Sequence, residues 1–502
     1  MMNAVPTDPA RVAYIIIDGM NRDALEQAIH GGRAPALAFI AERARYVRDS
    51  VAIFPTITPA ATASLVTGET PARHGIPGMC WYSHEAQRFV NYGQSPRAAV
   101  VEGVSQVVRD FLVNLNTVHL SPDVRTIHER LDGLGLTTAS INYMVFRGPV
   151  EHELRTNLLE RLLFFRRGHP DVLPGPKEHY FADIVTGPTE ACTKLLSVRG
   201  FNKRIRATDG WAACITRELL VKERADMVLF YLHENDHASH RFGPSKQTDS
   251  LAEADEHIAH VLDGYSSWEE ALDKVGFVVT ADHSQSPVSN DRDHIVDFMD
   301  VFDDLNLVRP DRGKEPFRNR DLAVAGNGRA AFFYLAPKRK RALHDPVVQR
   351  LSEVNGVDQV MWRDGGDYVV SSERGTLRFR SDAGGDTSDE RGNTWSWEGD
   401  LGAVDAVVEE GRVRTPEYPL AFWRIASALD CERIGDIVAT MKLTYEATDL
   451  AGADHRGGGD HASLHAQDST VPFLSTLGAP PQHPATVDVV PHIVGHFERR
   501  GT

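Results

Sequence analysis

Aspartate and histidine recur in four segments of the sequence, each beside a short apolar run. Asp18 directly follows the run VAYIII, and the pair Asp282 and His283 directly follows GFVVTA. Asp236 and His240 lie in HENDHASHRFG, which comes after the run DMVLFY. Their spacing places both on one face of the segment if it is helical. Carboxylate oxygens and imidazole nitrogens are ordinary zinc ligands, so each pair could bind a metal ion.

The fourth segment, HRGGGDHASLHAQDSTVPFL, combines histidines with glycines before a predicted strand. Its candidate ligands are His455, His461 and His465. Glycine allows the backbone to approach a buried metal ion closely. In the second segment His233 and His237 compete with His240, which we rank first. One Asp-His pair is also common in ordinary turns, but four such segments at predicted strand ends favour a metal centre. The candidate oxygen and nitrogen ligands are numerous enough for two metal ions.

The apolar runs predict the strands that must position these residues. Four runs are nearly continuous in apolar or β-favouring residues, as in strands buried on both faces: 12–17, 137–142, 226–231 and 276–281. Helical patterns lie between them, for example at 35–47 and 249–265. This alternation predicts an α/β fold, with a parallel sheet and helices on both sides. Open sheets of this kind bind ligands at the carboxyl ends of their strands, where Asp18 is expected.

A hydroxyl group stands at the predicted start of a helix in FPTITPAATASLVTG. Thr58 directly precedes Pro59, which is an ordinary N-cap arrangement, and Gly68 ends the helix. The free N–H groups and the positive dipole of a helix N-terminus also suit a phosphoryl group. A Thr58 hydroxyl bound to a divalent cation would lose its proton more readily and become a nucleophile. Thr56 and Thr62 are rival hydroxyls, but Thr62 lies one turn into the helix and Thr56 lacks the cap position.

The middle of the chain has a different character from the rest. The segments NGRAAFFYLAP and DYVVSS read as strands around a helix near 345–355, and a polar loop is expected at 381–400. The core appears again as the apolar segment 434–441. We interpret the region between as an inserted α+β cap. The expected units are a first part of the core at 10–290, the cap at 291–430 and a last part of the core at 431–500.

The composition excludes several classes of protein. With 502 residues, 42% hydrophobic, the chain is long enough for a large core, and its net charge of -16 disfavours a protein that binds a nucleic-acid polymer. Its four cysteines are widely spaced, which indicates neither a disulfide framework nor a thiolate zinc site. The start of the sequence does not resemble a signal peptide, and no apolar run approaches the roughly 20 residues of a membrane span. We therefore expect a soluble, cytoplasmic protein without a membrane partner.

The motifs IIIDGM, FPTITPAATASLVTGETPARHGIPG, HENDHASHRFGP, TADHSQSPV and GGDHASLHAQDSTVPFL occur in this order. In that order they resemble the type I phosphodiesterase/nucleotide pyrophosphatase family of the alkaline phosphatase superfamily. The resemblance covers 12–150, 225–290 and 430–495. It implies an alkaline-phosphatase-like core and a hydrolase with two divalent ions, zinc before manganese, and a covalent threonine intermediate. It also implies two ligand sets: Asp18, Thr58, Asp282 and His283 for one metal, and Asp236, His240 and His461 for the other.

Some departures from the family pattern bear on the substrate. After HGIPG the family carries an asparagine that helps to hold the phosphoryl oxygen, whereas this sequence has Met79, with Asn91 as a candidate replacement. TPAAT stands where the diesterases have an aromatic residue and Pro-Asn, and Ala462 replaces the usual glycine. Sulfatases are disfavoured because their C/S-x-P-x-R segment is absent. The mutase branch is disfavoured because it presents serine at the position of Thr58.

We therefore expect a phosphohydrolase acting on a small phosphorylated substrate. The preferred substrate is a phosphodiester or a nucleotide-type pyrophosphate, with Thr58 as the nucleophile. One alternative is a phosphomonoesterase or phosphonate hydrolase on the same site. Another is a binding protein that keeps the fold without catalysis, which the complete set of ligands disfavours.

Overall fold

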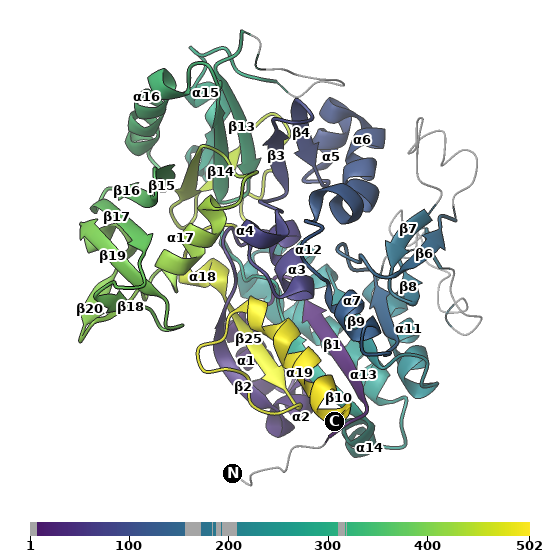
Figure 1. The fold of residues 1–502 in the computed structure, drawn as a ribbon. Helices are drawn as coiled ribbons and strands as arrows, with labels where there is room; N and C mark the ends of the chain where they lie inside the picture. The colour runs from purple at the N-terminus through teal and green to yellow at the C-terminus, as the bar shows by residue number, and fades with distance from the viewer. Residues whose placement is uncertain are drawn as a thin grey trace.

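The computed structural model describes residues 8–155, 172–182, 184–186, 192, 208–309, 317 and 319–501. A seven-stranded sheet has the strand order β2-β25-β10-β1-β9-β5-β8 (Figure 1). The five strands from β10 to β8 are parallel, and β25 is antiparallel to both β10 and β2. The predicted α/β fold with a mostly parallel central sheet is confirmed. The strands are β1 (Arg11–Ile17), β2 (Arg45–Val51), β5 (Thr138–Ile141), β8 (Glu178–Tyr180), β9 (Met227–Leu232), β10 (Val275–Thr280) and β25 (Thr470–Ser475).

Strand β1 shows why the central strands read as continuous apolar runs. Successive side chains of a strand point to opposite faces, and here both faces are covered. Ile15 packs into one core cluster, and its neighbours Tyr14 and Ile16 pack into the other. The helices beside Ile15 are α1 (Arg22–His30), α2 (Pro35–Arg43), α11 (Asp209–Val221), α13 (Gln247–Leu262) and α14 (Trp268–Lys274). Those on the opposite face include α3 (Thr58–Thr67), α7 (Ile127–Asp132) and α19 (Val489–Gly501).

A second, ten-stranded sheet lies beside the first and is drawn mainly in green at the upper left of Figure 1. Its order is β13-β14-β22-β15-β16-β17-β19-β18-β21-β20. Helix α16 (Lys340–Glu353) matches the helix expected near 345–355. The strands are β13 (Leu322–Asn327), β14 (Ala330–Leu335), β15 (Val357–Asp364), β16 (Asp367–Ser372), β17 (Gly375–Ser381), β18 (Thr387–Ser388), β19 (Thr394–Gly399), β20 (Val407–Glu409), β21 (Arg412–Arg414) and β22 (Ile437–Met441).

Two expectations for this region were wrong. The segment 434–441 was expected to return to the core, but β22 pairs with β14 and β15 of the second sheet. A fully buried strand has the same apolar pattern in either sheet, so the pattern does not assign its partner. The segment 381–400 was expected to be a loop, but it contains β18 and β19, with Trp395 almost fully buried. The division into core and cap stays a proposal.

Short elements connect the two sheets and bring the predicted site segments together. Strand β11 (Ser286–Pro287), just after His283, pairs with β24 (Gly459–Asp460), just before His461. Strand β12 (Ile295–Asp297) pairs with β23 (Glu446–Thr448). The remaining short strands are β3 (Cys80–Ser83), β4 (Arg88–Asn91), β6 (Val150–Glu153) and β7 (Val172–Gly175). The remaining α-helices in the described part of the chain are α4 (Pro71–His74), α5 (Pro96–Ala98), α6 (Val104–Arg109), α12 (Glu234–Phe242), α15 (Phe298–Val301), α17 (Ala421–Leu429) and α18 (Ala466–Ser469).

The cysteines differ from the expectation. Cys192 and Cys214 form a disulfide, whereas Cys80 and Cys431 are free and buried. Wide sequence spacing does not exclude a disulfide when the fold brings two cysteines together.

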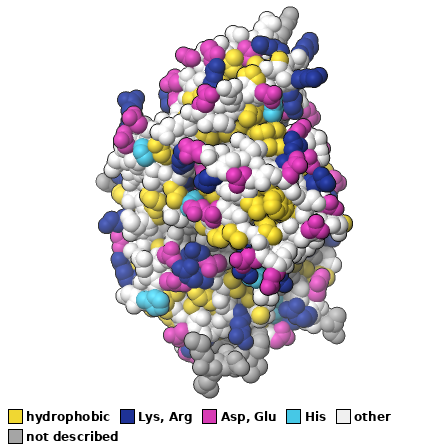
Figure 2. Space-filling model, turned by 90° about the vertical axis from the view of Figure 1, so that its left-hand side faces the viewer, with side chains coloured by type: hydrophobic (Ala, Val, Ile, Leu, Met, Phe, Trp, Pro, Cys, Tyr) yellow, Lys and Arg dark blue, Asp and Glu magenta, His cyan; other side chains and the backbone are white. Residues whose placement is uncertain are grey.

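Within the described ranges, none of the helices combines the length and the apolar composition needed to span a bilayer. The face shown in Figure 2 carries acidic and basic side chains interspersed with small apolar patches.

Candidate active site

The first ligand group lies at the carboxyl ends of the neighbouring strands β1 and β10. Asp18 follows β1, and Asp282 and His283 follow β10 after one further residue. His283 Nε2 lies 3.5 Å from Asp18 Oδ1 and 3.4 Å from Asp282 Oδ2. Candidate ligand atoms of all three residues lie within 4.8 Å of one another, and all three residues are buried. The structure therefore brings together the two carboxylates and the imidazole predicted for one metal.

The carboxylates of this group fit a cation. Asp18 Oδ1 and Asp282 Oδ2 are buried without a hydrogen-bond partner. Burial and then the negative charge of Asp282 raise the pKa of Asp18 well above its usual range, and burial also raises the pKa of Asp282. Two adjacent buried carboxylates are costly unless a positive charge compensates them. A divalent ion would supply that charge and accept both unpartnered oxygens.

The second ligand group combines helix α12 with the loop after β24. Asp236 and His240 lie one turn apart on α12, with His240 Nε2 3.2 Å from Asp236 Oδ2. His461 Nε2 lies 3.9 Å from Asp236 Oδ1. In each ring the Nδ1–H group donates a hydrogen bond to a backbone carbonyl. That of His240 donates to Gly459 at 2.8 Å, and that of His461 donates to Thr56 at 2.6 Å. Hydrogen bonds of this kind orient histidines that bind metals and leave Nε2 free as a ligand.

Asp236 also connects the two groups. Asp236, His283 and His461 offer ligand atoms within 4.8 Å of one another, and the rings of His283 and His461 stack with centroids 3.6 Å apart. Burial opposes the ionisation of Asp236, but His240, with smaller effects of His461 and His283, outweighs burial and lowers the pKa of Asp236. Against the effect of burial, Asp236 raises the pKa of His240 to about 9. A metal ion can take the place of the proton that this pair shares.

Thr58 lies beside the first group, but not as the expected cap. Helix α3 has Ile57 at its N-cap and Thr58 as its first residue, so the cap prediction was wrong by one position. The Thr58 hydroxyl contacts His283 Nε2 at 3.1 Å. The Thr62 hydroxyl donates to the Thr58 carbonyl within the helix. The Thr56 hydroxyl donates to the carbonyl of Ser463 and accepts from a neighbouring backbone N–H. Of the three hydroxyls, Thr58 is the one placed against the predicted ligands.

The rival histidines have other surroundings. His233 Nδ1 lies 2.9 Å from Asp209 Oδ1, and His237 is exposed. His465 pairs with Glu417, with His465 Nε2 2.5 Å from Glu417 Oε1. His455 pairs with a buried carboxylate, although its ring stacks on that of His240.

Sequence reasoning missed three residues that contact the ligands. The Tyr231 hydroxyl donates to Asp18 Oδ2, and Gln285 Nε2 donates to Asp236 Oδ1. Asp460 offers a carboxylate oxygen within 4.8 Å of ligand atoms of His240 and His461. Asp460 directly precedes His461 in GGGDH, and Gln285 lies two positions after His283. The closeness of Asp460 and Gln285 in sequence to predicted ligands was therefore the signal that could have identified these two residues.

Comparison with known proteins settles the family. The sequence profile of the type I phosphodiesterase/nucleotide pyrophosphatase family matches residues 12–464. The chain belongs to this family. It is accordingly a hydrolase of phosphoric ester bonds, as its motifs predicted. A comparison with curated protein sequences gives no significant match.

Solved structures of similar fold include two kinds of hydrolase. Murine ectonucleotide pyrophosphatase/phosphodiesterase 5 matches with a TM-score of 0.56 and 12% identity, over 97% of this chain and 95% of that one. Phosphonoacetate hydrolase from Sinorhizobium meliloti 1021, solved with phosphonoacetate, matches with a TM-score of 0.57 and 20% identity, over 98% and 96%. At these identities the likeness concerns the fold, and it confirms the predicted alkaline-phosphatase-like core.

The family's phosphoryl-holding asparagine has no simple replacement at Met79. Asn91 is buried, and its amide is already engaged. Asn91 Nδ2 donates to Glu102 Oε1 at 3.0 Å, and Oδ1 accepts from the backbone of the following turn. Asn327 accepts from the Met79 N–H at 2.7 Å and donates to the carbonyl of Cys80 at 2.8 Å. Asn327 therefore holds the backbone at Met79, whereas Asn91 holds the turn after β4.

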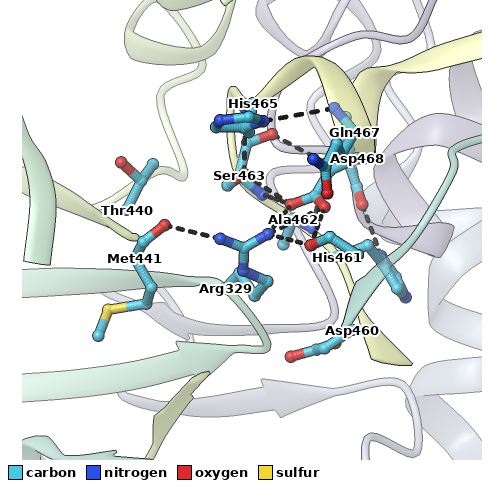
Figure 3. A network of polar contacts seen from close by, with 12 residues as sticks. Arg329, Thr440, Met441, Asp460, His461, Ala462, Ser463, His465, Gln467 and Asp468 are labelled. Carbon is cyan, nitrogen blue, oxygen red and sulfur yellow. Dashed lines mark hydrogen bonds and ion pairs between the residues drawn. The ribbon is translucent and has the colours of Figure 1, made fainter. Parts of the chain in front are cut away.

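Arg329, in the β13–β14 turn, ties the second sheet to the loop of His461 (Figure 3). Its Nη1 lies 3.0 Å from both carboxylate oxygens of Asp468, and both side chains are fully buried. The Arg329 backbone N–H donates to the His461 carbonyl at 2.7 Å. Asp468 also accepts from the hydroxyl of Ser463 at 2.6 Å. A buried ion pair thus supports the loop that carries a predicted metal ligand.

Proposed function

We propose that this family member is a two-metal phosphohydrolase that cleaves a small phosphodiester or a nucleotide-type pyrophosphate through a covalent threonine intermediate. The observation that carries the proposal is the position of the Thr58 hydroxyl, 3.1 Å from His283 Nε2 in the first ligand group. Asp18, Thr58, Asp282 and His283 would hold one ion, and Asp236, His240 and His461 the other. Zinc is the favoured ion and manganese the alternative.

Residues of the chain itself would bind the phosphoryl group and exchange the bonds at phosphorus. Thr58 Oγ1 would form a bond to phosphorus as the bond from phosphorus to the leaving oxygen breaks, and the hydroxyl proton would pass to solvent. Water would then cleave the phosphothreonine and restore the hydroxyl. The backbone N–H groups of Thr58 and Ala60, at the start of α3, lack partners within the helix and suit a phosphoryl oxygen. When bound, the ions would lower the pKa of the hydroxyl and neutralise the phosphoryl charge.

One experiment tests this function directly. The zinc-loaded enzyme is mixed with a nucleotide p-nitrophenyl ester and quenched in acid. Fragmentation of the peptide that contains FPTITPAATASL should place the trapped nucleotidyl group on Thr58. Turnover of the ester without any adduct on this peptide would contradict the covalent mechanism.

A phosphonate or phosphomonoester substrate is the second candidate. The observation that favours it is that Glu102 engages the amide of Asn91 and the backbone at Met79 and Cys80 engages that of Asn327. Neither amide is left to replace the family's phosphoryl-holding asparagine. A relative of similar fold is a phosphonoacetate hydrolase. A panel of bis-p-nitrophenyl phosphate, p-nitrophenyl phosphate, a nucleotide p-nitrophenyl ester and phosphonoacetate separates the classes by kcat/KM.

We also propose that the segment 291–430 is an inserted cap that helps to select the substrate. Its β13–β14 hairpin contacts both the Met79 backbone, through Asn327, and the His461 loop, through Arg329. Exchanging this cap for that of a relative should change substrate preference more than metal content. An unchanged substrate profile would contradict the assignment.

The compartment is a separate proposal. We propose the cytoplasm, as expected in the sequence analysis; a Cys192–Cys214 disulfide, which is typical of oxidising compartments, argues against it. Fractionation of cells that express the tagged full chain, with thiols blocked at lysis, reports both the location and the state of this cysteine pair.

A further inference from the structure

A third group of metal-ligating side chains lies next to the second ligand group. Glu446 in β23, Asp460 in β24 and His455 in the connection between them offer ligand atoms within 4.8 Å of one another. Glu446 and Asp460 are each only 1% exposed. His455 Nδ1 lies 2.6 Å from Glu446 Oε1 and 3.9 Å from Asp460 Oδ1. Two oxygen ligands and one nitrogen ligand therefore converge in a buried position.

One carboxylate oxygen of this group has no partner. Asp460 Oδ2 is buried without a hydrogen bond. It faces Gly328, where a Cβ atom would lie only 2.8 Å from Asp460 Oδ2 and 2.7 Å from Oδ1. The Gly328 carbonyl accepts from the Ala447 N–H, so the strand that carries Glu446 also passes this glycine. A buried carboxylate oxygen without a partner is rare in folded proteins and points to a missing ligand.

The charge of the group points in the same direction. Glu446 and Asp460 bring two carboxyl groups into this group, beside the single imidazole of His455. The nearby arginines are engaged elsewhere, because Arg456 pairs with Asp454 and Arg329 pairs with Asp468. Burying a net negative charge is costly, whereas a divalent cation would balance both carboxylates and leave His455 neutral as a ligand.

We propose that Glu446, His455 and Asp460 form a third divalent-cation site, beyond the two sites of the proposed function. The mixed oxygen and nitrogen ligands suit zinc or manganese. The site adjoins the second ligand group, because Asp460 also lies within 4.8 Å of ligand atoms of His240 and His461. The ring of His455 stacks on that of His240 with centroids 4.2 Å apart. An ion that fixes His455 would therefore also restrict the ring of His240.

Anomalous diffraction tests the site without any substitution. Crystals of the full chain grown with zinc are measured on both sides of the zinc absorption edge. The proposal predicts a peak between Glu446, His455 and Asp460, in addition to peaks at the first and second ligand groups. Peaks at those two groups alone would overturn the third site and leave the proposed function intact. A peak at the third site alone would support it and count against the proposed two-metal centre, and a map without peaks would overturn both.

Metal content in solution provides an independent readout. Wild-type protein and the Glu446→Gln variant are loaded with zinc, dialysed against zinc-free buffer and analysed for zinc per chain. Glu446→Gln should lose one ion per chain relative to wild type. Asp454→Asn is the matched control, because Asp454 lies beside His455 in sequence but is half-exposed and paired with Arg456. It should retain the full count, and equal counts in wild type and Glu446→Gln would overturn the site.

Discussion

The hydroxyl oxygen of Thr58 lies 3.1 Å from Nε2 of His283, although 225 positions separate the two residues in the sequence. The same nitrogen lies 3.5 Å from Asp18 Oδ1 and 3.4 Å from Asp282 Oδ2. The hydroxyl is therefore directed to the first ligand group rather than to the N–H groups of its own helix. This contact is the one expected if Thr58 has the proposed role of nucleophile.

Replacing Thr58 tests that distinction. Thr58→Ala should lower kcat by more than about a thousandfold, because the nucleophile is lost. The free energy of unfolding should fall by about 1 kcal/mol or less, because Thr58 makes one side-chain hydrogen bond and does not cap the helix. Thr58→Ser keeps a hydroxyl and should retain measurable turnover. Steady-state kinetics and urea unfolding measure both effects, and full activity of Thr58→Ala would rule out this nucleophile.

Helix α12 offers a matched pair of histidines for testing metal dependence. His240 contacts Asp236, whereas His237 is exposed on the same helix. His240→Asn should reduce zinc content and lower activity by at least about a hundredfold. Loss of a residue that only supports a metal ligand costs up to about that factor, and His240 is itself a predicted ligand. His237→Asn should change neither.

Complete chelation should abolish wild-type activity and added zinc should restore it. A chelated enzyme that stays active would contradict metal dependence.

Much of the site framework could be predicted from local sequence. The strands β1 and β10 are continuous apolar runs, and Asp18, Asp282 and His283 lie just beyond their ends. Parallel strands bring such ends to one edge of a sheet, so these residues could be grouped before the structure was known. Their roles as metal ligands stay predictions.

Features that depend on contacts distant in sequence could not be predicted in the same way. The helix expected at 35–47 ends at Arg43, because the next residues form edge strand β2 against β25. Asp460 has no distinctive spacing of its own, and its neighbour Glu446 lies in a separate strand. Asn91 could be proposed as a phosphoryl ligand only while its bond to Glu102 was unknown. Local pattern identifies a residue type but not its partner.

Glu102 provides a pH dependence outside the ligand groups. Burial, opposed by the hydrogen bond from Asn91, raises the pKa of Glu102 from 4.5 to about 7. A carboxyl with a raised pKa in the folded state binds its proton more tightly there than in the unfolded chain. Its contribution to stability is therefore complete below about pH 4.5 and is lost as the pH rises towards 7, by roughly 3 kcal/mol in total.

Glu102→Gln cannot ionise and should lose this part of the pH dependence. Urea unfolding at pH 5 and pH 8 should show a smaller fall in the free energy of unfolding for Glu102→Gln than for wild type. Glu85→Gln, at an exposed position in the turn between β3 and β4, is the control and should behave as wild type. The same fall in Glu102→Gln as in wild type would mean that Glu102 ionises as freely in the folded state as in water.

The ion pair between Arg329 and Asp468 should couple stability to the second ligand group. Arg329→Met leaves Asp468 buried without its positive partner, which should cost about 3–5 kcal/mol in the free energy of unfolding. Because Asp468 also holds Ser463, two residues after His461, zinc affinity should fall as well. Arg363→Met, which breaks a more exposed pair with Asp430, should cost about 1 kcal/mol or less.

A double variant separates the lost charge from the lost arrangement of the loop. Arg329→Met combined with Asp468→Leu removes both buried charges and should recover much of the stability lost in Arg329→Met alone. It should not recover zinc affinity, because the double variant also removes the carboxylate partner of Ser463. Urea unfolding and zinc titration of the two variants measure these quantities separately. If zinc affinity returned together with stability, the ion pair would act only through global folding and not by positioning His461.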